Sequence, residues 1–287
     1  MKLPARVAGA TAGPLEQEID ARWLMAYSAA LGETAPAYFD TTRADGILAH
    51  PLFPVCYEWP LAVDLREHAI GAELSARSVH ATHDLVLHRV PRPGDRLTTT
   101  AKVTAVESRT PGAYVVTRLA TVDHRGAPVS VTEYGSLYRG VACDADAAPR
   151  APSPPEPGLP AMLWSETIPL AAGLAHVYTE CARIWNPIHT DRAVAQAAGL
   201  PDIILHGTAT LALAVTAVLR RLGAPRDVTR VRCQFRGMVA LPSAITVSAS
   251  APAGPPGAEV IAFEVKNAAG QPALTRGSVA LAPRASG

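Results

Sequence analysis

The sequence contains an internal repeat, which constrains the fold more than any other feature of the chain. Residues 25–40, MAYSAALGETAPAYFD, match residues 176–191, HVYTECARIWNPIHTD, with tyrosine, proline and aspartate recurring at an offset of 151. Two later pairs of segments match in the same order: ILAHPLF (47–53) with ILHGTAT (204–210), and RPGDRLTTTAKV (92–103) with LPSAITVSASAP (241–252). Three matching blocks in one order predict a duplicated domain of about 150 residues.

Composition predicts where the two copies are joined. Residues 142–160 read ACDADAAPRAPSPPEPGLP and have no hydrophobic period. Proline-rich segments of this kind act as semi-rigid spacers. We therefore expect an N-terminal domain at 1–141, a proline-rich linker at 142–160 and a C-terminal domain at 161–287.

The same order of elements is predicted in both halves. A short helix is expected from Asp20 to Leu31 and from Ala171 to Ile184, and a long apolar helix at 52–67 and 207–222. Segments rich in valine and threonine follow in each copy and are typical of strands. A long apolar helix followed by antiparallel strands predicts an α+β fold, with a sheet wrapped around a buried helix in each half. The two sheets would pair as an internal pseudo-dimer.

Charge and apolar patterning exclude several classes of partner. Lysine and arginine total 26 against 25 acidic residues, so we expect neither nucleic acid nor an anionic membrane as a partner. The first residues contain no apolar core typical of a secretory signal. The apolar run from Ile203 to Leu219 contains a histidine and ends at two arginines, which favours a buried helix over a membrane span.

The cysteines and histidines give no sign of a metal site. Four cysteines are widely spaced and form no CxxC pair, as is typical of free thiols in a reducing compartment. His80, His83 and His88 lie in one strand-like stretch, and His80 and His88 would be about 26 Å apart in an extended strand, too far to share a metal. We expect these three histidines at the surface or at a sheet edge. The overall prediction is a cytoplasmic protein that could form a homodimer and that uses no metal and no cofactor.

The strongest functional signal lies in the second copy. A tyrosine precedes NPIHTD by eight residues, and ILHG then leads into an apolar helix, all within residues 176–213. This arrangement resembles the MaoC-like, (R)-specific enoyl-CoA hydratase family. The resemblance implies the hotdog fold, often duplicated in one chain, and an acyl-CoA or acyl carrier protein thioester as substrate. It also implies an Asp–His pair that holds the reacting water and a glycine N–H that binds the thioester carbonyl.

Carried over residue by residue, that motif is incomplete here. The family histidine maps to His189, the asparagine to Asn186 and the glycine of the later HG pair to Gly207. The family aspartate maps to Ile184, which has no proton to give, and the glycine before it maps to Arg183. Half of the usual acid–base pair is therefore missing.

His189 and Gly207 are the predicted catalytic residues. A neutral imidazole can act as a general base near pH 7, although a buried histidine can also be purely structural. Gly207 opens the apolar helix, where a free N–H would stabilise an oxyanion by about 3–4 kcal/mol, unless the glycine is needed only for packing. In the first copy Tyr38 and Pro51 stand at these two positions. That half should therefore be non-catalytic and shape the acyl or pantetheine tunnel.

Neighbouring residues complete the predicted site. Glu180, one helical turn before the missing aspartate, is a candidate replacement acid, or else it forms a local ion pair with Arg183. Arg183 is also expected to bind a carboxylate or phosphate of the substrate. Asn186 either fixes the turn at Pro187 or contacts substrate. Trp185 and His206 are expected to line the substrate-binding site.

The residue that follows the motif has a structural interpretation. Asp191 directly precedes the segment RAVAQAAG, which has the character of a short helix and reaches a glycine at 199. Aspartate is a preferred N-cap residue. We therefore expect Asp191 to cap this helix and to take no part in catalysis.

Three functions fit these residues. The first is an acyl-thioester hydratase or dehydratase, a lyase acting on enoyl or 3-hydroxyacyl thioesters. The second keeps the fold and changes the reaction to an isomerisation, cyclisation or β-elimination in specialised metabolism. The third is a non-catalytic thioester-binding subunit that needs an active partner. A thioesterase is less favoured, because the apolar helix GTATLALAVTAVL carries no carboxylate.

Overall fold

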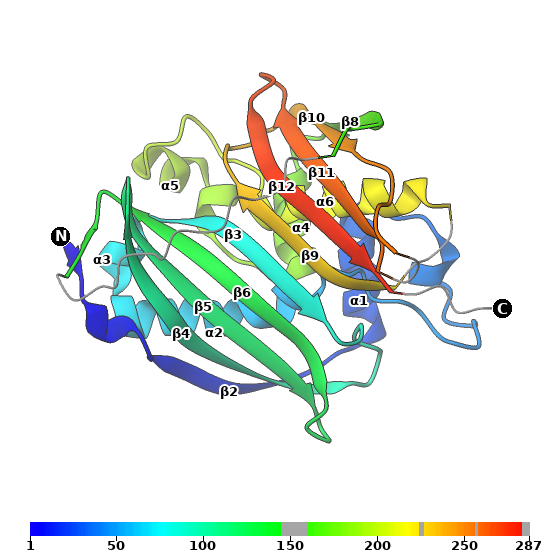
Figure 1. Cartoon of the computed structure of the whole chain (residues 1–287), viewed down its shortest axis with the longest axis horizontal. Coiled ribbons are helices and arrows are strands. Elements are labelled where there is room, and N and C mark those ends of the chain that lie inside the picture. The colour runs from blue at the N-terminus through cyan, green and yellow to red at the C-terminus, as the bar shows by residue number, and fades with distance from the viewer. Residues whose placement is uncertain (145–159, 224–226, 256–257, 283–287) are drawn as a thin grey trace.

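The protein is built on one large antiparallel sheet, seen in a computed structural model that describes residues 1–144, 160–223, 227–255 and 258–282. Its ten strands lie in the order β2-β4-β5-β6-β3-β9-β12-β11-β10-β8 (Figure 1). The first five, in that order, are Thr11–Glu18, Arg96–Arg109, Gly112–Asp123, Pro128–Arg139 and Ser78–Leu87. The other five are Val228–Phe235, Pro272–Leu281, Val260–Asn267, Ser243–Ala249 and Trp164–Leu170.

The strand order shows the duplication directly. Read inward from each edge, the N-terminal order β2-β4-β5-β6-β3 is matched by β8-β10-β11-β12-β9. The halves meet through β3 and β9, where Leu85 pairs with Val231 and His83 with Cys233. The two sheets are thus joined edge to edge by main-chain hydrogen bonds, which satisfies two edges that would otherwise be open.

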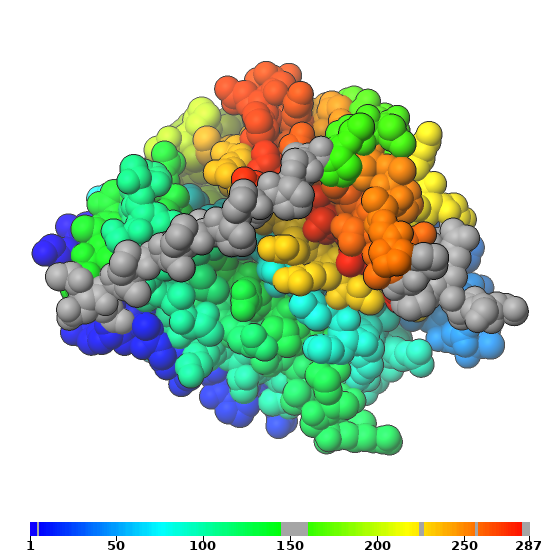
Figure 2. Space-filling model, viewed as in Figure 1, coloured from blue at the N-terminus to red at the C-terminus, as the bar shows by residue number. Residues whose placement is uncertain are grey.

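The outer face of the sheet carries charged side chains across this junction. Figure 2 shows β3, in cyan, beside β9, in yellow-orange, where the halves meet. Arg230 donates two hydrogen bonds of 2.7 Å to the carboxylate of Asp84, and Arg232 lies 3.1 Å from the same carboxylate. A forked guanidinium pair of this kind fixes geometry as well as charge.

Both long helices lie on the inner face of the sheet (Figure 1). They are α2 (Pro54–Ile70) and α6 (Gly207–Arg221). Residues 209–218 of α6 are all buried, as expected for a helix that is apolar all round. Most of the apolar run from Ile203 to Leu219 is therefore a buried helix, as predicted, although the helix begins only at Gly207. None of the helices in the described ranges is long and apolar enough to cross a bilayer.

Shorter helices position the repeated motif. The equivalent helices α1 (Ala21–Ala30) and α4 (Leu174–Ala182) contact each other, and their tyrosines, Tyr27 and Tyr178, have ring centroids 5.8 Å apart. The other short α-helices of the described residues are α3 (Ala72–Ser75) and α5 (Arg192–Ala197), and short 3-10 helices lie at Ala5–Val7 and Pro36–Tyr38. Asp191 accepts hydrogen bonds from the N–H groups of the second and third residues of α5, Ala193 and Val194, which confirms its predicted role as an N-cap.

Most of the predicted linker lies outside the described residues. At its start, β7 (Ala142–Cys143) pairs in parallel with β1 (Lys2–Leu3), forming a separate two-stranded sheet. At the other end of the gap, β8 pairs with β10 along its whole length from Trp164 to Leu170.

Candidate active site

His189 sits at the end of a tight turn that precedes α5. The 3-10 turn η3 (Pro187–His189) is capped by Asn186, whose side-chain oxygen accepts a hydrogen bond from the N–H of Ile188 at 3.5 Å. Asn186 therefore has the structural role that was one of its two predicted alternatives. The turn leaves the His189 side chain only 9% exposed.

The protonation state of His189 follows from the one hydrogen bond that its ring makes within the described residues. Its Nδ1 lies 2.8 Å from the carbonyl oxygen of Ile204. A carbonyl can only accept, so Nδ1 carries the proton and Nε2 keeps its lone pair. Burial lowers the pKa of His189 to about 4, with the Ile204 hydrogen bond acting in the opposite direction. At neutral pH this residue is an uncharged imidazole with Nε2 available as a base.

His206 packs directly against this ring. The two imidazoles are stacked with centroids 3.7 Å apart and planes 27° apart. His206 Nε2 is hydrogen-bonded to the Thr179 hydroxyl at 3.2 Å, while its buried Nδ1 has no partner among the described residues. Burial, and then the neighbouring His189, lower the pKa of His206 to about 2, so it is neutral and shapes the site without donating charge.

Gly207 begins α6 beside this stack. Within the described part of the chain its N–H has no hydrogen-bond acceptor, as is usual for the first residue of a helix. A Cβ at this position would come within 3.0 Å of two ring carbons of Phe235, so the absence of a side chain lets that ring pack close. The Tyr178 hydroxyl donates to Thr208 Oγ1 at 3.1 Å and ties the start of α6 to α4.

No carboxylate among the described residues forms a hydrogen bond or ion pair with His189 or His206. Ile184, at the position of the missing aspartate, is 3% exposed and its N–H bonds the carbonyl of Thr179. Glu180, the predicted replacement, is exposed on α4. The described residues therefore place a buried neutral imidazole near an N–H without an acceptor, and no carboxylate is paired with that imidazole.

Arg183 and Trp185 have contacts that the sequence did not reveal. Arg183 ends α4 in the left-handed conformation, φ 58°, which explains why a glycine suits this position in the related motif. Its guanidinium lies 4.0 Å above the ring of Trp23 and 3.7 Å from Asp20, both from the N-terminal half. Trp185 is 61% exposed and does not close over the site.

The first copy has neither the histidine nor the glycine at the equivalent positions. Tyr38 replaces His189, and Pro51 has no N–H to offer. Both ring nitrogens of His50 are engaged: Nδ1 accepts from the Leu52 N–H at 3.1 Å, and Nε2 bonds the hydroxyl of Thr216 on α6 at 3.1 Å.

The prediction that His80 and His83 lie at a surface or sheet edge was wrong. Strand β3 is paired on both sides, so it is internal to the sheet. His83 is 2% exposed, and the His80 ring stacks on Tyr134 at 3.7 Å and lies 4.3 Å from Phe235. A signal was present in the sequence, because His83 shares strand parity with the apolar Leu85 and Leu87. His88 is exposed, as expected.

Comparison with known proteins supports this description. Residues 165–271 match the family model of the MaoC like domain, and residues 6–132 match that of the FAS1-like, dehydratase domain region. None of the curated proteins matches the sequence.

Solved structures resemble the whole chain. The MaoC-like dehydratase from Phytophthora capsici is 19% identical, with a TM-score of 0.84 and 98% of each chain covered. The peroxisomal multifunctional enzyme type 2 from Drosophila melanogaster is 22% identical, with a TM-score of 0.72. The match covers 93% of this chain and 48% of the Drosophila chain. A putative oleoyl thioesterase from Lactobacillus plantarum is 10% identical, with a TM-score of 0.64 and 96% and 97% of the two chains covered.

A shared fold does not by itself separate dehydratases from thioesterases. The family models are more specific, because each matches a dehydratase-type region in one half of this chain. Residues 165–271 are therefore similar to the MaoC like domain, residues 6–132 are similar to the FAS1-like dehydratase region, and the chain as a whole has the double hotdog fold.

Proposed function

We propose that the protein is an acyl-thioester hydratase or dehydratase, acting on an enoyl or 3-hydroxyacyl thioester of coenzyme A or acyl carrier protein. His189 is the base and the N–H of Gly207 is the oxyanion donor. The observation that carries this proposal is the single hydrogen bond from His189 Nδ1 to Ile204, which leaves Nε2 as a free acceptor beside the open start of α6.

In this mechanism one residue moves the proton twice. His189 Nε2 takes a proton from water as the water oxygen bonds to the β-carbon of the enoyl group. The π electrons move onto the thioester carbonyl, whose oxygen accepts a hydrogen bond from Gly207. The His189 imidazolium then returns the proton to the α-carbon, which completes the addition of water. Dehydration follows the same steps in reverse.

The environment of His189 favours one half of this cycle. A pKa of about 4 makes the imidazolium a strong acid, so protonation of the α-carbon is easy. The same pKa makes the neutral ring a weak base towards water. We therefore expect slower hydration than with a paired carboxylate, since acid–base assistance contributes about 10²–10⁴-fold.

A second candidate follows from the buried Ile184. A site that keeps a base and an oxyanion donor but lacks an acid also suits an isomerisation, cyclisation or β-elimination. Ile184→Asp distinguishes the two. If the native reaction is not hydration, this variant gains hydratase activity and loses the native one. If hydration is native, only the hydratase rate rises.

The test is loss of enoyl absorbance with enoyl-CoA thioesters of increasing chain length. We expect turnover by the wild type and a loss of about 10²-fold or more in His189→Ala. His88→Ala is the matched control, because His88 is exposed and should leave the rate unchanged. Absence of turnover at every length, together with unchanged thioester binding by His189→Ala, would instead favour a non-catalytic binding subunit.

A further inference from the structure

The first copy carries a carboxylate at the position where the second copy lacks one. The offset of 151 that relates Tyr38 to His189 also relates Glu33 to Ile184. The acid of the usual motif is therefore present in the chain, in the half that has no histidine at the motif position.

The backbone supports this equivalence. The N–H of Glu33 bonds the carbonyl of the residue five positions earlier at 3.1 Å, and the N–H of Ile184 does the same. The residues directly before them, Gly32 and Arg183, both have a left-handed backbone, with φ of 71° and 58°. The two loops therefore leave α1 and α4 in the same way and place Glu33 and Ile184 at matching points of the fold.

A chain of hydrogen bonds from both halves leads to the Glu33 carboxylate. His50 Nδ1 accepts from the Leu52 N–H at 3.1 Å, so Nε2 carries the proton of the neutral ring and donates to Thr216 Oγ1 at 3.1 Å. Thr216, which is 2% exposed on α6, keeps one hydroxyl proton to donate. Burial raises the pKa of Glu33, while the charge of Arg220 and a hydrogen bond from Thr216 act in the opposite direction. The half-buried carboxylate is thus held by a buried donor, with a guanidinium nearby.

A pocket lies beside this chain, between α6, the end of α1 and the edge strand β8 (Figure 1). Its cavity volume is about 160 Å³, room for about five water molecules or a ligand group of similar size. Leu31, Leu213 and Ala217 form apolar walls. Thr216 and Arg220, the two groups that act on Glu33, also line the pocket, so the Glu33 carboxylate lies close to the cavity.

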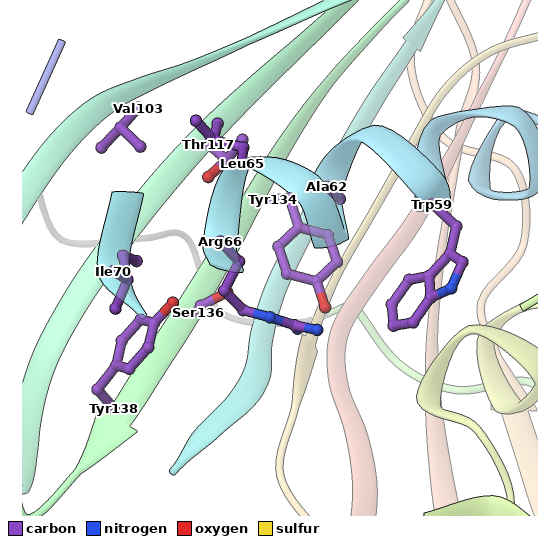
Figure 3. Close-up of a pocket in the computed structure, with 10 residues that line it drawn as sticks. All are labelled: Trp59, Ala62, Leu65, Arg66, Ile70, Val103, Thr117, Tyr134, Ser136 and Tyr138. Carbon is purple, nitrogen blue, oxygen red and sulfur yellow. The ribbon is translucent and has the colours of Figure 1, made fainter. Parts of the chain in front are cut away.

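A second hollow shows by contrast how much space matters. It lies between α2 and the inner face of β4, β5 and β6, where Arg66 and Tyr134 are among its lining residues (Figure 3). Its cavity volume is about 20 Å³, room for little more than one water molecule. Of these two, the pocket beside α6 is the one that can take an organic group.

The arginine of the larger pocket is able to turn towards a ligand. Arg220 lies 3.9 Å from Glu166 on β8, and both side chains are about half-exposed. A long, solvated ion pair of this kind holds its members weakly. A guanidinium has five N–H donors, so Arg220 can stabilise an oxyanion formed near the carboxylate of Glu33.

We propose that this pocket is a second active site, where a short-chain acyl thioester is hydrolysed with Glu33 as the base and Arg220 as the oxyanion donor. The inference shares with the proposed function only its substrate class, an acyl thioester. The first copy lacks the histidine and the N–H used for hydration, but hydrolysis in this pocket needs neither. The acyl chain lies between Leu31, Leu213 and Ala217.

The reaction needs water and no other co-reactant. Glu33 takes a proton from a water molecule as the water oxygen bonds to the carbonyl carbon of the thioester. The π electrons of the carbonyl move onto its oxygen, which accepts hydrogen bonds from Arg220. When this electron pair returns, the carbon–sulfur bond breaks, and the leaving thiolate takes the proton from Glu33. The products are a carboxylic acid and a free thiol.

The test is release of free coenzyme A from acetyl-, butyryl- and hexanoyl-CoA, followed with a thiol reagent. These saturated thioesters have neither a double bond nor a 3-hydroxyl group, so hydration and dehydration cannot contribute. We expect the wild type to release thiol faster than the protein-free blank with at least one of them. Glu33→Gln should lower this rate about 10²-fold or more, and Arg220→Met about 10²-fold. Glu33→Asp should keep part of the activity.

Glu133→Gln is the matched control, because Glu133 is half-exposed on β6 and pairs with Arg118 at 3.8 Å. It should hydrolyse at the wild-type rate. No release above the blank by the wild type at any chain length overturns the inference, and so does equal release by Glu33→Gln and the wild type. Hydrolysis without turnover of any enoyl-CoA contradicts the proposed function and supports the inference. Enoyl turnover without hydrolysis of saturated thioesters does the reverse.

Discussion

The two halves of the molecule carry the same motif at the same place in the fold, yet only the C-terminal copy keeps the histidine and the glycine. In the C-terminal half, His189 holds a free Nε2 and stacks on the residue that precedes Gly207. In the N-terminal half, Tyr38 and Pro51 occupy the corresponding positions. The first copy therefore lacks both the imidazole and the backbone N–H, and its long helix begins at Pro54, three residues after the position that corresponds to Gly207.

The histidines that directly precede Gly207 and Pro51, His206 and His50, also differ in their hydrogen bonds. His206 keeps one nitrogen without a described partner, whereas His50 uses both, and one of its bonds crosses to Thr216 on the long helix of the other half. The first copy thus contributes a buried hydrogen bond to the long helix of the second. Duplication allows this division, because a second copy can lose its chemistry and still supply half of the core.

The largest expected effect comes from replacing one buried histidine of each half in turn. His189→Ala should lower kcat/KM about 10²–10⁴-fold with a small change in stability. His50→Ala should leave kcat/KM within a few-fold, and it should lower the free energy of unfolding by about 2–4 kcal/mol, because it opens a cavity and strands two polar groups. Enoyl turnover and urea denaturation measure the two quantities. A large activity loss in His50→Ala would mean that the first copy takes part in catalysis.

The pH dependence gives an intermediate effect. With a pKa of about 4, His189 stays neutral at pH 7, so kcat/KM should be flat from about pH 7 to about pH 5 and fall below about pH 4. A profile that turns near the ordinary histidine pKa of about 6.5 would contradict burial as the controlling factor.

Stability should follow the same titration with a defined sign. Burial lowers the pKa of His50 to about 3 and that of His189 to about 4. Between about pH 6.5 and pH 4 the unfolded chain binds protons that the folded chain does not, so the free energy of unfolding falls as pH falls through this window. His50→Ala should reduce that slope more than His88→Ala, which removes an exposed histidine.

The smallest expected effect is that of Glu180→Gln. Glu180 is exposed on α4 and makes no hydrogen bond with His189. Its loss should change kcat/KM less than about twofold. A loss of 10²-fold or more would show that Glu180 reaches the substrate and replaces the missing aspartate.

Much of this comparison could be predicted from the sequence, because the repeat, the helix caps and the prolines are recognised from residues close together in the chain. The equivalent helices, the cap at Asp191 and the loss of the N–H at Pro51 all follow from residues close together in the chain. The pairing of β3 with β9 could not be predicted in this way, since their paired residues are 144 to 152 positions apart, from Val86–Arg230 to Thr82–Gln234.

Contacts between the halves escaped prediction for the same reason. The ring beneath Arg183 belongs to Trp23, and the partner of His50 is Thr216, each from the other half of the chain. The burial of His80 and His83 depends on β3 being internal, which is again a property of the junction.

The central claim is that the active half differs from the blocked half by a usable N–H at the start of its long helix, and a pair of variants tests it most directly. Gly207→Pro removes the N–H as in the first copy. It should fold, because proline suits the first helical position and the backbone of His206, φ −57° and ψ 138°, suits a residue before proline. Gly207→Ala brings a comparable Cβ against Phe235 and keeps the N–H. We predict that Gly207→Pro has a kcat about 10²–10³-fold below that of Gly207→Ala. Equal kcat values in the two folded variants would contradict the claim.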